Sequence, residues 1–221
     1  MAESRFIVKE KNLESTEKLT RKEREFQSRR NEILDAALKL FATKGYYNTS
    51  MQEIATESEF SIGTLYNFFK NKEELFFTLV GERSEGIFAN ILADVQSATD
   101  PLDKISALVE SLLKHFETEK KFFKIFLGIR TNFEWELKDD LGEKLHNAYL
   151  KYIEFLTMVI RDAQRAGKIK DVDSSLLAHT LLGIINSNIF QWFTSDADYS
   201  LVAKKDLILD LFFHGAVRSG A

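Results

Sequence analysis

The sequence has no cysteine, and it has only one proline and ten glycines among its 221 residues. The lack of cysteine excludes a disulfide-stapled scaffold and thiol catalysis. The scarcity of proline and glycine disfavours turn-rich β architectures. Apolar residues recur with a period near 3.6 almost everywhere, without the alternation typical of strands. These features together predict an all-α protein.

Segments that mark export or membrane insertion are also missing. The first twenty residues contain no apolar run of signal-peptide length. One long uncharged stretch, 174–195, has ten polar residues among its 22. It is therefore interpreted as a buried or interface helix and not as a membrane span. We expect a cytoplasmic protein.

Motifs of catalysis and metal binding are absent from the sequence. It contains no G-x-S-x-G, phosphate loop or H-E-x-x-H, and no carboxylate pair with a supporting histidine. The four histidines, His115, His146, His179 and His214, do not have the spacing of metal ligands. We expect a protein that is not an enzyme and needs no metal or cofactor.

Helix start and stop signals divide the chain into segments. A first long helix ends at Lys44, before Gly45, and the sequence leaves open whether residues 1–20 extend it or are disordered. Ser50 with Glu53, and Asn71 with Glu74, are spaced as N-cap pairs that open later helices. Short helices are expected from about 50 and over 62–69, and a long one from about 72 to 98. Further helices are predicted at 102–118, 121–130, 136–166, 173–194 and 201–217.

Charge is distributed unevenly along the chain, whose net charge is −4. Residues 18–72 hold ten Lys and Arg against seven Asp and Glu, whereas residues from 81 onward hold seventeen against twenty-one. A mildly basic N-terminal part on an acidic body permits binding to a polyanion such as DNA by one end only.

The segment 51–70 has the pattern of a helix-turn-helix. Ile54 and Leu65 are expected to pack between its two short helices, Ala55 to allow their close crossing, and Phe60 to fill the turn, with Phe68 also buried. The alternative is an ordinary helical hairpin. The second helix has an outward face suited to base edges and phosphates, formed with the residues just after it by Ser61, Gly63, Thr64, Tyr66, Asn67, Lys70 and Lys72.

Residues 29–76 resemble the N-terminal domain of TetR-type transcription regulators. The matching positions include Ile33-Leu34, Lys44-Gly45-Tyr46, Ile54-Ala55 and Gly63-Thr64-Leu65-Tyr66. The resemblance implies that Thr49, Tyr66 and Lys72 contact phosphates, with Arg30 beside the DNA surface. It also implies that Gly63 permits close approach to the duplex and that Thr64 touches bases or phosphate. Asn67 is the candidate for base readout.

One departure from the family pattern lies in the turn, where Ser58-Glu59-Phe60 replaces the usual Ala-Gly-Val. A glycine there tolerates a left-handed backbone. Glu59 is therefore expected to cost roughly 1 kcal/mol or to reshape the turn.

The expected domain organisation is an N-terminal extension (1–20), a three-helix DNA-binding domain (21–76) and a larger helical domain for effector binding and dimerisation (77–221). Thirteen of the nineteen phenylalanines lie at or beyond Phe76. Each is expected in the core, but as a set they favour an apolar or amphipathic effector. The candidate pocket residues are His115, Phe116, Phe123, Phe126 and Tyr149, and Asn132 is a further candidate for orienting a ligand.

The last two long helices carry the predicted dimer interface, because the resemblance implies a four-helix contact between two subunits. Gly183 and Ser187 would permit close approach of the helices, and the alternative is that these helices form monomer core. The predicted interface residues are Leu177, Leu181, Ile184, Asn188, Trp192, Leu207 and Leu211. The resemblance thus implies a homodimeric repressor that binds a palindromic operator and is released by a small effector. The alternative is a helical adaptor that binds proteins and not DNA. The resemblance also implies a bacterial cytoplasmic protein, associated with the nucleoid when bound to DNA.

Overall fold

The computed structural model describes residues 20–131, 140–195 and 199–215, with the side chains of 126–148 outside the description. Every regular element in this part is a helix, which confirms the predicted all-α fold. The elements are α1 (Arg21–Lys44), α2 (Met51–Glu57), α3 (Ile62–Phe68), α4 (Lys72–Ser97), α5 (Pro101–Thr118), α6 (Lys120–Thr131), α7 (Asp140–Arg165), α8 (Ser174–Thr194), the 3-10 helix η1 (Leu201–Lys204) and α9 (Lys205–His214).

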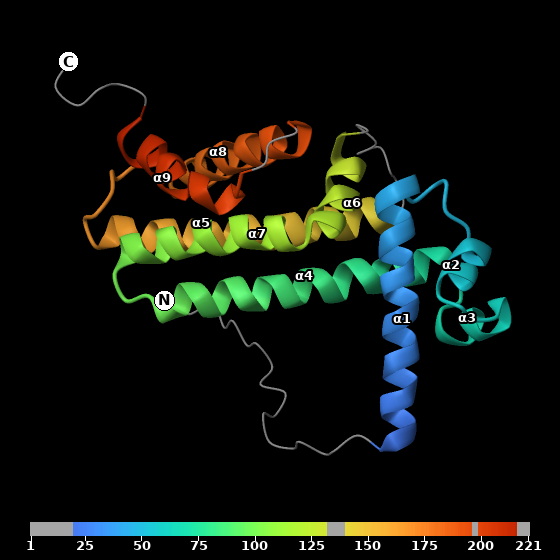
Figure 1. Ribbon diagram of the computed structural model, residues 1–221. Coiled ribbons are helices and arrows are strands. Elements are labelled where there is room, and N and C mark those ends of the chain that lie inside the picture. Colours follow the sequence, from blue (N-terminus) through green and yellow to red (C-terminus); the bar gives the residue numbers. More distant parts are fainter. Residues whose placement is uncertain (1–19, 132–139, 196–198, 216–221) are drawn as a thin grey trace.

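Helix α1 begins at a capping box that the sequence reading overlooked. The Thr20 hydroxyl accepts from the Glu23 amide, and the Glu23 carboxylate accepts from the Thr20 amide. The first helix therefore begins directly after Thr20. Only its second half is buried, by the side chains Ile33, Leu34, Ala36, Ala37, Leu38, Leu40, Phe41 and Ala42. Its first turns project beyond the rest of the molecule (Figure 1).

Helices α2 and α3 form the predicted helix-turn-helix, in which α2 packs against α1 and α3 packs against α2. Ile54, Ala55 and Leu65 are fully buried, as the sequence predicted, while Phe60 is partly buried against the same core. Two short helices bury too little surface to be stable alone, so the buried half of α1 is a necessary part of this unit.

The turn between α2 and α3 has the strained backbone expected from its sequence. Glu59 has φ +60°, a left-handed value that glycine adopts without strain. The Phe60 amide donates to the Ala55 carbonyl at 3.0 Å and the Glu59 amide to the Thr56 carbonyl at 3.2 Å. These two bonds form a Schellman motif with Glu59 at its left-handed position. The turn therefore has the backbone geometry that a glycine would give it, and Glu59 adopts this geometry at a cost in conformational free energy.

Helix α4 joins the N-terminal unit to the body. It runs without a break through the predicted domain boundary between residues 76 and 77. Phe76 and Leu79, in its first half, belong to the same buried cluster as Phe41 of α1, and its second half packs along α5. The predicted domain boundary between residues 76 and 77 therefore lies inside α4, a helix that both parts share.

The body is built around α5, which contacts α4, α6, α7, α8 and α9. Helices α4, α5 and α7 lie side by side, and α8 and α9 cover the side of α5 and α7 opposite α4 (Figure 1). The segment after α8 is tied to α5 by the Ser200 hydroxyl, which donates to Glu117 at 3.0 Å, and by the Lys205–Glu110 ion pair at 2.9 Å.

The last predicted helix, 201–217, differs from the observed one. The chain forms a 3-10 turn at Leu201–Lys204 and then α9, which ends at His214 before Gly215 with φ +76°. The amide of Gly215 donates to the Leu211 carbonyl and closes the helix. The helix predicted over 136–166 ends close to its expected point, since α7 ends at Arg165 and Gly167 has φ +68°.

Replacing Glu59 by glycine should stabilise the protein. The left-handed backbone costs a residue with a Cβ about 1 kcal/mol more than it costs glycine. For a chain of this length, relief of that strain corresponds to a rise in melting temperature of about 2 to 4 °C. Thermal unfolding followed by circular dichroism measures the change. Glu59→Ala is the matched control, because it removes the carboxylate but keeps the Cβ. An equal gain from Glu59→Ala would show that charge and not backbone strain is responsible.

Candidate DNA-binding face

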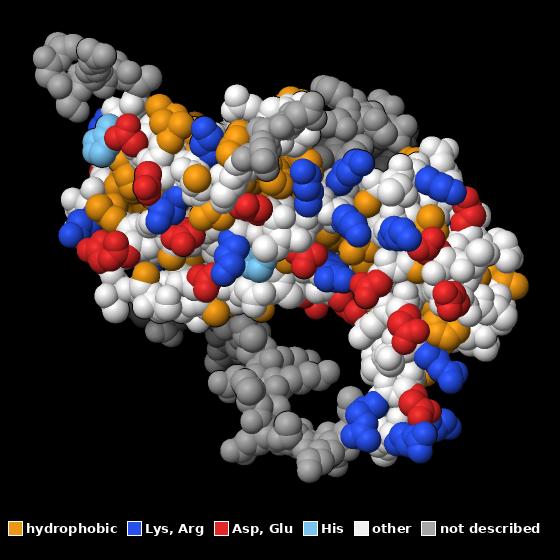
Figure 2. Space-filling view, viewed as in Figure 1, with side chains coloured by type: hydrophobic (Ala, Val, Ile, Leu, Met, Phe, Trp, Pro, Cys, Tyr) orange, Lys and Arg blue, Asp and Glu red, His pale blue; other side chains and the backbone are white. Residues whose placement is uncertain are grey.

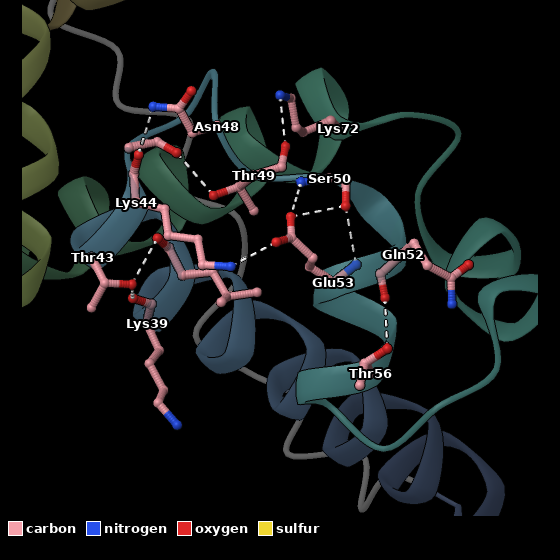
Figure 3. A network of polar contacts seen from close by, with 12 residues as sticks. Lys39, Thr43, Lys44, Asn48, Thr49, Ser50, Gln52, Glu53, Thr56 and Lys72 are labelled. Carbon is pink, nitrogen blue, oxygen red and sulfur yellow. Dashed lines mark hydrogen bonds and ion pairs between the residues drawn. The ribbon is translucent and has the colours of Figure 1, made fainter.

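The loop between α1 and α2 is held by the first residue of α4. Lys72 Nζ donates to the carbonyl oxygens of Tyr46 and Thr49, each at 2.8 Å, and lies 4.4 Å from the centre of the Tyr46 ring. The Thr49 hydroxyl donates to the Gly45 carbonyl at 2.8 Å, and this side chain is only 2% exposed. Figure 3 shows Lys72 and Thr49 meeting at the start of α2.

The start of α2 is fixed by the predicted Ser50–Glu53 capping box. The Ser50 hydroxyl accepts from the Glu53 amide at 3.2 Å, and Glu53 Oε2 accepts from the Ser50 amide at 2.8 Å. Lys44, the last residue of α1, adds an ion pair to Glu53 Oε1 at 2.6 Å. The hydrogen bond from Lys44, together with those from Ser50, lowers the pKa of Glu53 from 4.5 to about 2. Helix α2 is thereby tied to the end of α1 (Figure 3).

Helix α3 presents a polar face outward. Its N-cap Ser61 accepts from the Thr64 amide at 3.1 Å, and the hydroxyls of these two residues lie 2.8 Å apart. Gly63 and Asn67 are exposed, and the Tyr66 side chain is 52% exposed although it is aromatic. Leu65, on the opposite face of the helix, is buried. The inward and outward faces are those that the sequence predicted.

An open groove of about 570 Å³ lies between this helix and the start of α2. It is lined by Tyr47, Asn48, Thr49, Ser50, Met51, Gln52, Ile62, Tyr66 and Lys72. Six of these residues were not among the predicted site residues: Tyr47, Asn48, Ser50, Met51, Gln52 and Ile62. For Tyr47 and Asn48 a usable signal was present, because they stand in the connection between the helix stop at Gly45 and the capping box at Ser50, and such connections run over the surface.

Some predicted contact residues have internal partners in this structure. Arg30 binds Glu82 of α4 through both guanidinium nitrogens, at 2.9 and 2.5 Å, and lies over the Phe69 ring. The Thr49 hydroxyl gives its proton to the Gly45 carbonyl, and Lys72 gives two of its three protons to carbonyls. Lys70 is exposed, and its amide donates to Glu74 at 2.6 Å. The geometry assigns Arg30 and Thr49 a clear structural part, whereas their contact with DNA stays a prediction.

The exposed first turns of α1 carry basic side chains. Figure 2 shows Lys and Arg gathered at the projecting end of α1, where Arg21, Lys22 and Arg24 are exposed. Arg21 is paired with Glu25 at 2.9 Å along the helix. The Phe26 ring stacks on Phe68 at 4.6 Å between centres, which fixes this part of α1 beside the end of α3.

A second ion-pair cluster links the DNA-binding unit to the body. Arg83 of α4 pairs with Asp35 of α1 at 2.7 Å and lies 3.6 Å from Glu119, which stands between α5 and α6. Together with the Arg30–Glu82 pair, it connects α1, α4 and the α5–α6 junction. A movement of the α5–α6 junction would therefore act on α1 through the ion pairs of Arg83.

The predicted effector residues have different surroundings. The rings of Phe116 and Phe123 are buried and stacked 3.5 Å apart. His115 is partly buried, and burial lowers its pKa. Tyr149 is partly buried against the core. The predictions for the Phe126 and Asn132 side chains lie outside the described residues.

Two buried hydroxyls of the body escaped the sequence reading. Ser111 Oγ on α5 and Tyr152 Oη on α7 are buried without a hydrogen-bond partner among the described residues. An unsatisfied buried hydroxyl costs about 1–3 kcal/mol. The apolar residues around a lone serine or tyrosine in a helix give no sign of such a deficit, so only the packed structure shows it.

The predicted dimer residues divide between core and surface. Leu181 and Trp192 are buried within the chain, and the Trp192 indole donates to the Tyr199 carbonyl at 3.0 Å. These two side chains therefore contribute to the core of the single chain, and their part in a dimer interface stays a prediction. Leu177, Ile184, Asn188 and Leu211 are partly buried, while Leu207 is 47% exposed.

The exposed apolar face of α8 was missed by the sequence reading. Leu176 is 63% and Phe190 55% exposed. Between them Thr180, Gly183 and Ser187 are exposed at spacings of three and four residues, so that the five side chains share one side of the helix. We call these five residues, with Leu207 of α9, the α8–α9 face.

Metal-binding groups of three or more His, Asp or Glu are absent from the described part of the chain. Within the same part, no helix is long and apolar enough to cross a membrane.

A helix-turn-helix with a polar recognition helix, joined by α4 to a helical body, defines a DNA-binding transcription regulator. Comparison with known proteins agrees, because residues 33–79 match the family described as bacterial regulatory proteins, tetR family, and residues 98–216 match the tetracyclin repressor-like C-terminal domain. The chain belongs to the TetR family of transcription regulators, with a DNA-binding N-terminal unit and a ligand-binding C-terminal domain.

Similar proteins include the fatty acid metabolism regulator protein of Bacillus subtilis, which is 26% identical over 186 residues (83% of this chain and 93% of the relative). Among solved structures, the TetR family regulator PfmR from Thermus thermophilus is 27% identical, with a TM-score of 0.71 over 84% of this chain and 99% of the other. The regulator FadR from Bacillus subtilis, solved in complex with stearoyl-CoA, shares the fold at 24% identity with a TM-score of 0.72, over 85% of this chain and 99% of that one.

The contacts of Glu53 should make stability depend on pH in acid. Its folded-state pKa is about 2 against an ordinary value of 4.5, so its contribution is complete above pH 4.5 and is lost as the pH falls towards 2. Glu53→Gln should lower the melting temperature at pH 7, and its difference from wild type should vanish near pH 2. Lys44→Met should remove the larger part of this pH dependence, because the Lys44 bond is its main cause. A difference that stays constant with pH would contradict the electrostatic account.

Proposed function

We propose that this protein is a homodimeric repressor that binds a palindromic operator and is released by a small hydrophobic or amphipathic effector. The observation that carries the proposal is the exposed polar face of α3 beside an open groove, with Leu65 buried behind it. A helix of this kind enters the major groove with its polar side turned to the bases.

The roles in DNA binding follow from exposure and chemistry. Asn67 is exposed and carries both a donor and an acceptor, the pair that reads an adenine edge. Tyr66 would donate its phenol proton to a phosphate, and Lys70 would supply charge. Ser61 and Thr64 stand at the start of α3, where their hydroxyls reach the backbone or a base. Gly63 lies between them without a side chain to hold the duplex away.

Lys72 and Thr49 have a different part in this scheme. Two of the Lys72 protons hold the α1–α2 loop, which leaves its third for a phosphate that enters the groove. The loop brings Tyr47 and Gln52 to the same groove. We therefore assign Thr49 and Arg30 mainly to the shape of the site, with phosphate contact secondary.

Dimerisation would set the distance between two such helices. Recognition helices must lie about 34 Å apart to enter successive major grooves on one side of DNA. In the α8–α9 face, the apolar side chains of Leu176, Phe190 and Leu207 are exposed. The small residues Gly183 and Ser187 lie between Leu176 and Phe190 along α8 and are exposed too. Small residues in the centre permit two helices to approach closely, and the apolar residues bury surface on contact.

The effector class is inferred from the body and from its relatives. The stacked Phe116 and Phe123 rings give α5 and α6 an aromatic interior. The related fatty acid metabolism regulator and the stearoyl-CoA complex of FadR support an effector with an apolar chain and a polar end. A helical adaptor that binds protein through the α8–α9 face is the alternative, and the DNA experiment distinguishes the two.

Selection of bound sequences from random duplex DNA tests the proposal. The wild-type protein should enrich a palindrome. Tyr66→Phe should weaken binding uniformly across sequences, because it removes a phosphate contact. Asn67→Ala should relax preference at one base pair of each half-site, at a cost of about 1–3 kcal/mol for the preferred sequence.

Thr56→Ala is a control, because Thr56 is exposed on α2 but is not among the residues that line the groove. Its selected sequences should equal those of wild type. If no sequence is enriched at low salt while the protein remains dimeric, the regulator proposal fails and the adaptor alternative takes its place.

A charge on the α8–α9 face should separate the subunits. Phe190→Glu places a carboxylate where an apolar surface would be buried, so the dimer dissociation constant should rise by at least about tenfold. Analytical ultracentrifugation measures it, and operator affinity should fall with it. Leu150→Glu is the matched control, because Leu150 is 47% exposed on α7, outside this face. Equal sedimentation of wild type and Phe190→Glu would place the interface elsewhere.

A further inference from the structure

The body contains two hydroxyls whose polar partner is missing among the described residues. Ser111 is 3% exposed, and its Oγ forms no hydrogen bond. Part of the Tyr152 ring reaches the surface, but its hydroxyl oxygen is buried and also unbonded. Thr157, a buried neighbour on α7, shows the usual solution, since its hydroxyl donates to the Ile153 carbonyl at 2.7 Å. Buried hydroxyls are normally paired, so these two exceptions indicate a partner from outside the chain.

Each hydroxyl stands within one turn of a residue that interacts with α4. Tyr152 stands three residues before Phe155 on α7, and the Phe155 ring lies 5.3 Å from that of Phe88 on α4. On α5, Ser111 stands four residues before His115, and Asp94 of α4 acts on the pKa of His115. Since α5 packs on both α4 and α7, this spacing is what two hydroxyls facing the interior between the three helices would have.

Tyr152 and His115 are uncharged at neutral pH. Burial raises the pKa of Tyr152, so its phenol keeps its proton and can donate. Burial also lowers the pKa of His115, whose imidazole is then neutral. A carboxylate placed beside them would lose its hydration and would stand near the carboxylates of Asp94 and Glu119 that act on His115, which is unfavourable. A neutral carbonyl oxygen, in contrast, can accept from both hydroxyls at no such cost.

We propose that Ser111 and Tyr152 hydrogen-bond a neutral carbonyl oxygen of the effector, such as that of an ester or thioester, and so select it over a free carboxylate. The apolar chain of the effector then lies against aromatic side chains of the body, among them Phe116 and Phe123. This inference rests on the proposed function, because it takes the effector to be amphipathic. The inference names the two residues that would bind the polar end of the effector and the kind of group, a neutral carbonyl, that they would accept there.

The test uses three probes that share one chain: stearoyl-CoA, methyl stearate and stearate, each delivered from methyl-β-cyclodextrin. Binding to the full-length protein is measured by calorimetry, and release of the selected operator by fluorescence anisotropy. Wild type should bind the thioester and the ester at least about tenfold tighter than stearate. Ser111→Ala and Tyr152→Phe should each weaken binding of these two by about tenfold, a hydrogen bond's share of affinity, and leave stearate almost unchanged.

The unliganded variants supply a second readout. Removing an unpaired hydroxyl should leave the melting temperature equal to or above that of wild type. Thr157→Val is the matched control, because it removes a buried hydroxyl that is already bonded within α7. It should leave the affinity for all three probes unchanged.

The outcomes separate this inference from the proposed function. Equal affinity of wild type, Ser111→Ala and Tyr152→Phe for the esters would overturn the inference and leave the effector class intact. The same holds for a marked loss of melting temperature in both variants, which would reveal an internal partner. Tight binding of stearate would overturn the selection for a neutral oxygen. If wild type binds its operator but none of the three probes, the amphipathic effector itself is overturned, and the inference with it.

Discussion

Helix α4 is the element on which the rest of the structure depends, because the DNA-binding unit and the body share it. Its first residue, Lys72, holds the α1–α2 loop through the carbonyls of Tyr46 and Thr49. One turn further on, Phe76 and Leu79 complete the core of the helix-turn-helix, and the second half of the helix packs along α5. A continuous helix transmits displacement along its axis, since each turn is hydrogen-bonded to the next. The position of α3 is therefore tied to the packing of α4 within the body.

The contacts between α1 and α4 are of two kinds: apolar contacts, which supply most of the stability, and ion pairs, which set the relative position of the helices. Burying side chains such as Phe41, Phe76 and Leu79 contributes about 1.5–3 kcal/mol each, whereas partly exposed ion pairs contribute roughly 0–1 kcal/mol. The apolar contacts therefore hold α1 to α4. The bonds of Arg30 with Glu82, and of Arg83 with Asp35 and Glu119, add little strength but require defined relative positions. Such a joint can change its angle at a small cost in free energy, which a regulator needs between its DNA-bound and released states.

Local chemistry made the DNA-binding unit predictable from its sequence. Ser50 with Glu53, the buried Leu65 and the exposed Asn67 depend on neighbours within one or two turns, so spacing alone identifies them. Arg30 could not be placed in this way, because its partner Glu82 is 52 positions away. Periodicity also failed on α8, whose apolar residues are spread around the helix and not gathered on one side. Leu181 and Trp192 face the core while Leu176 and Phe190 face outward, and only the packing of α5 and α7 decides between these sides.

The same interior explains how an effector would oppose DNA. The hydroxyls of Ser111 on α5 and Tyr152 on α7 are buried and have no hydrogen-bond partner in the described body. A ligand that satisfies them stabilises whichever arrangement of α4 accommodates it, in proportion to its differential affinity for the two states. Under the proposed function, operator DNA would favour the arrangement that places two α3 helices about 34 Å apart. If these arrangements differ, each ligand must weaken the other by the same factor, because the coupling free energy belongs to the protein and not to either site. Effector binding at the unpaired hydroxyls of the body and DNA binding at α3 would then be coupled through one conformational equilibrium, in which α4 changes its position.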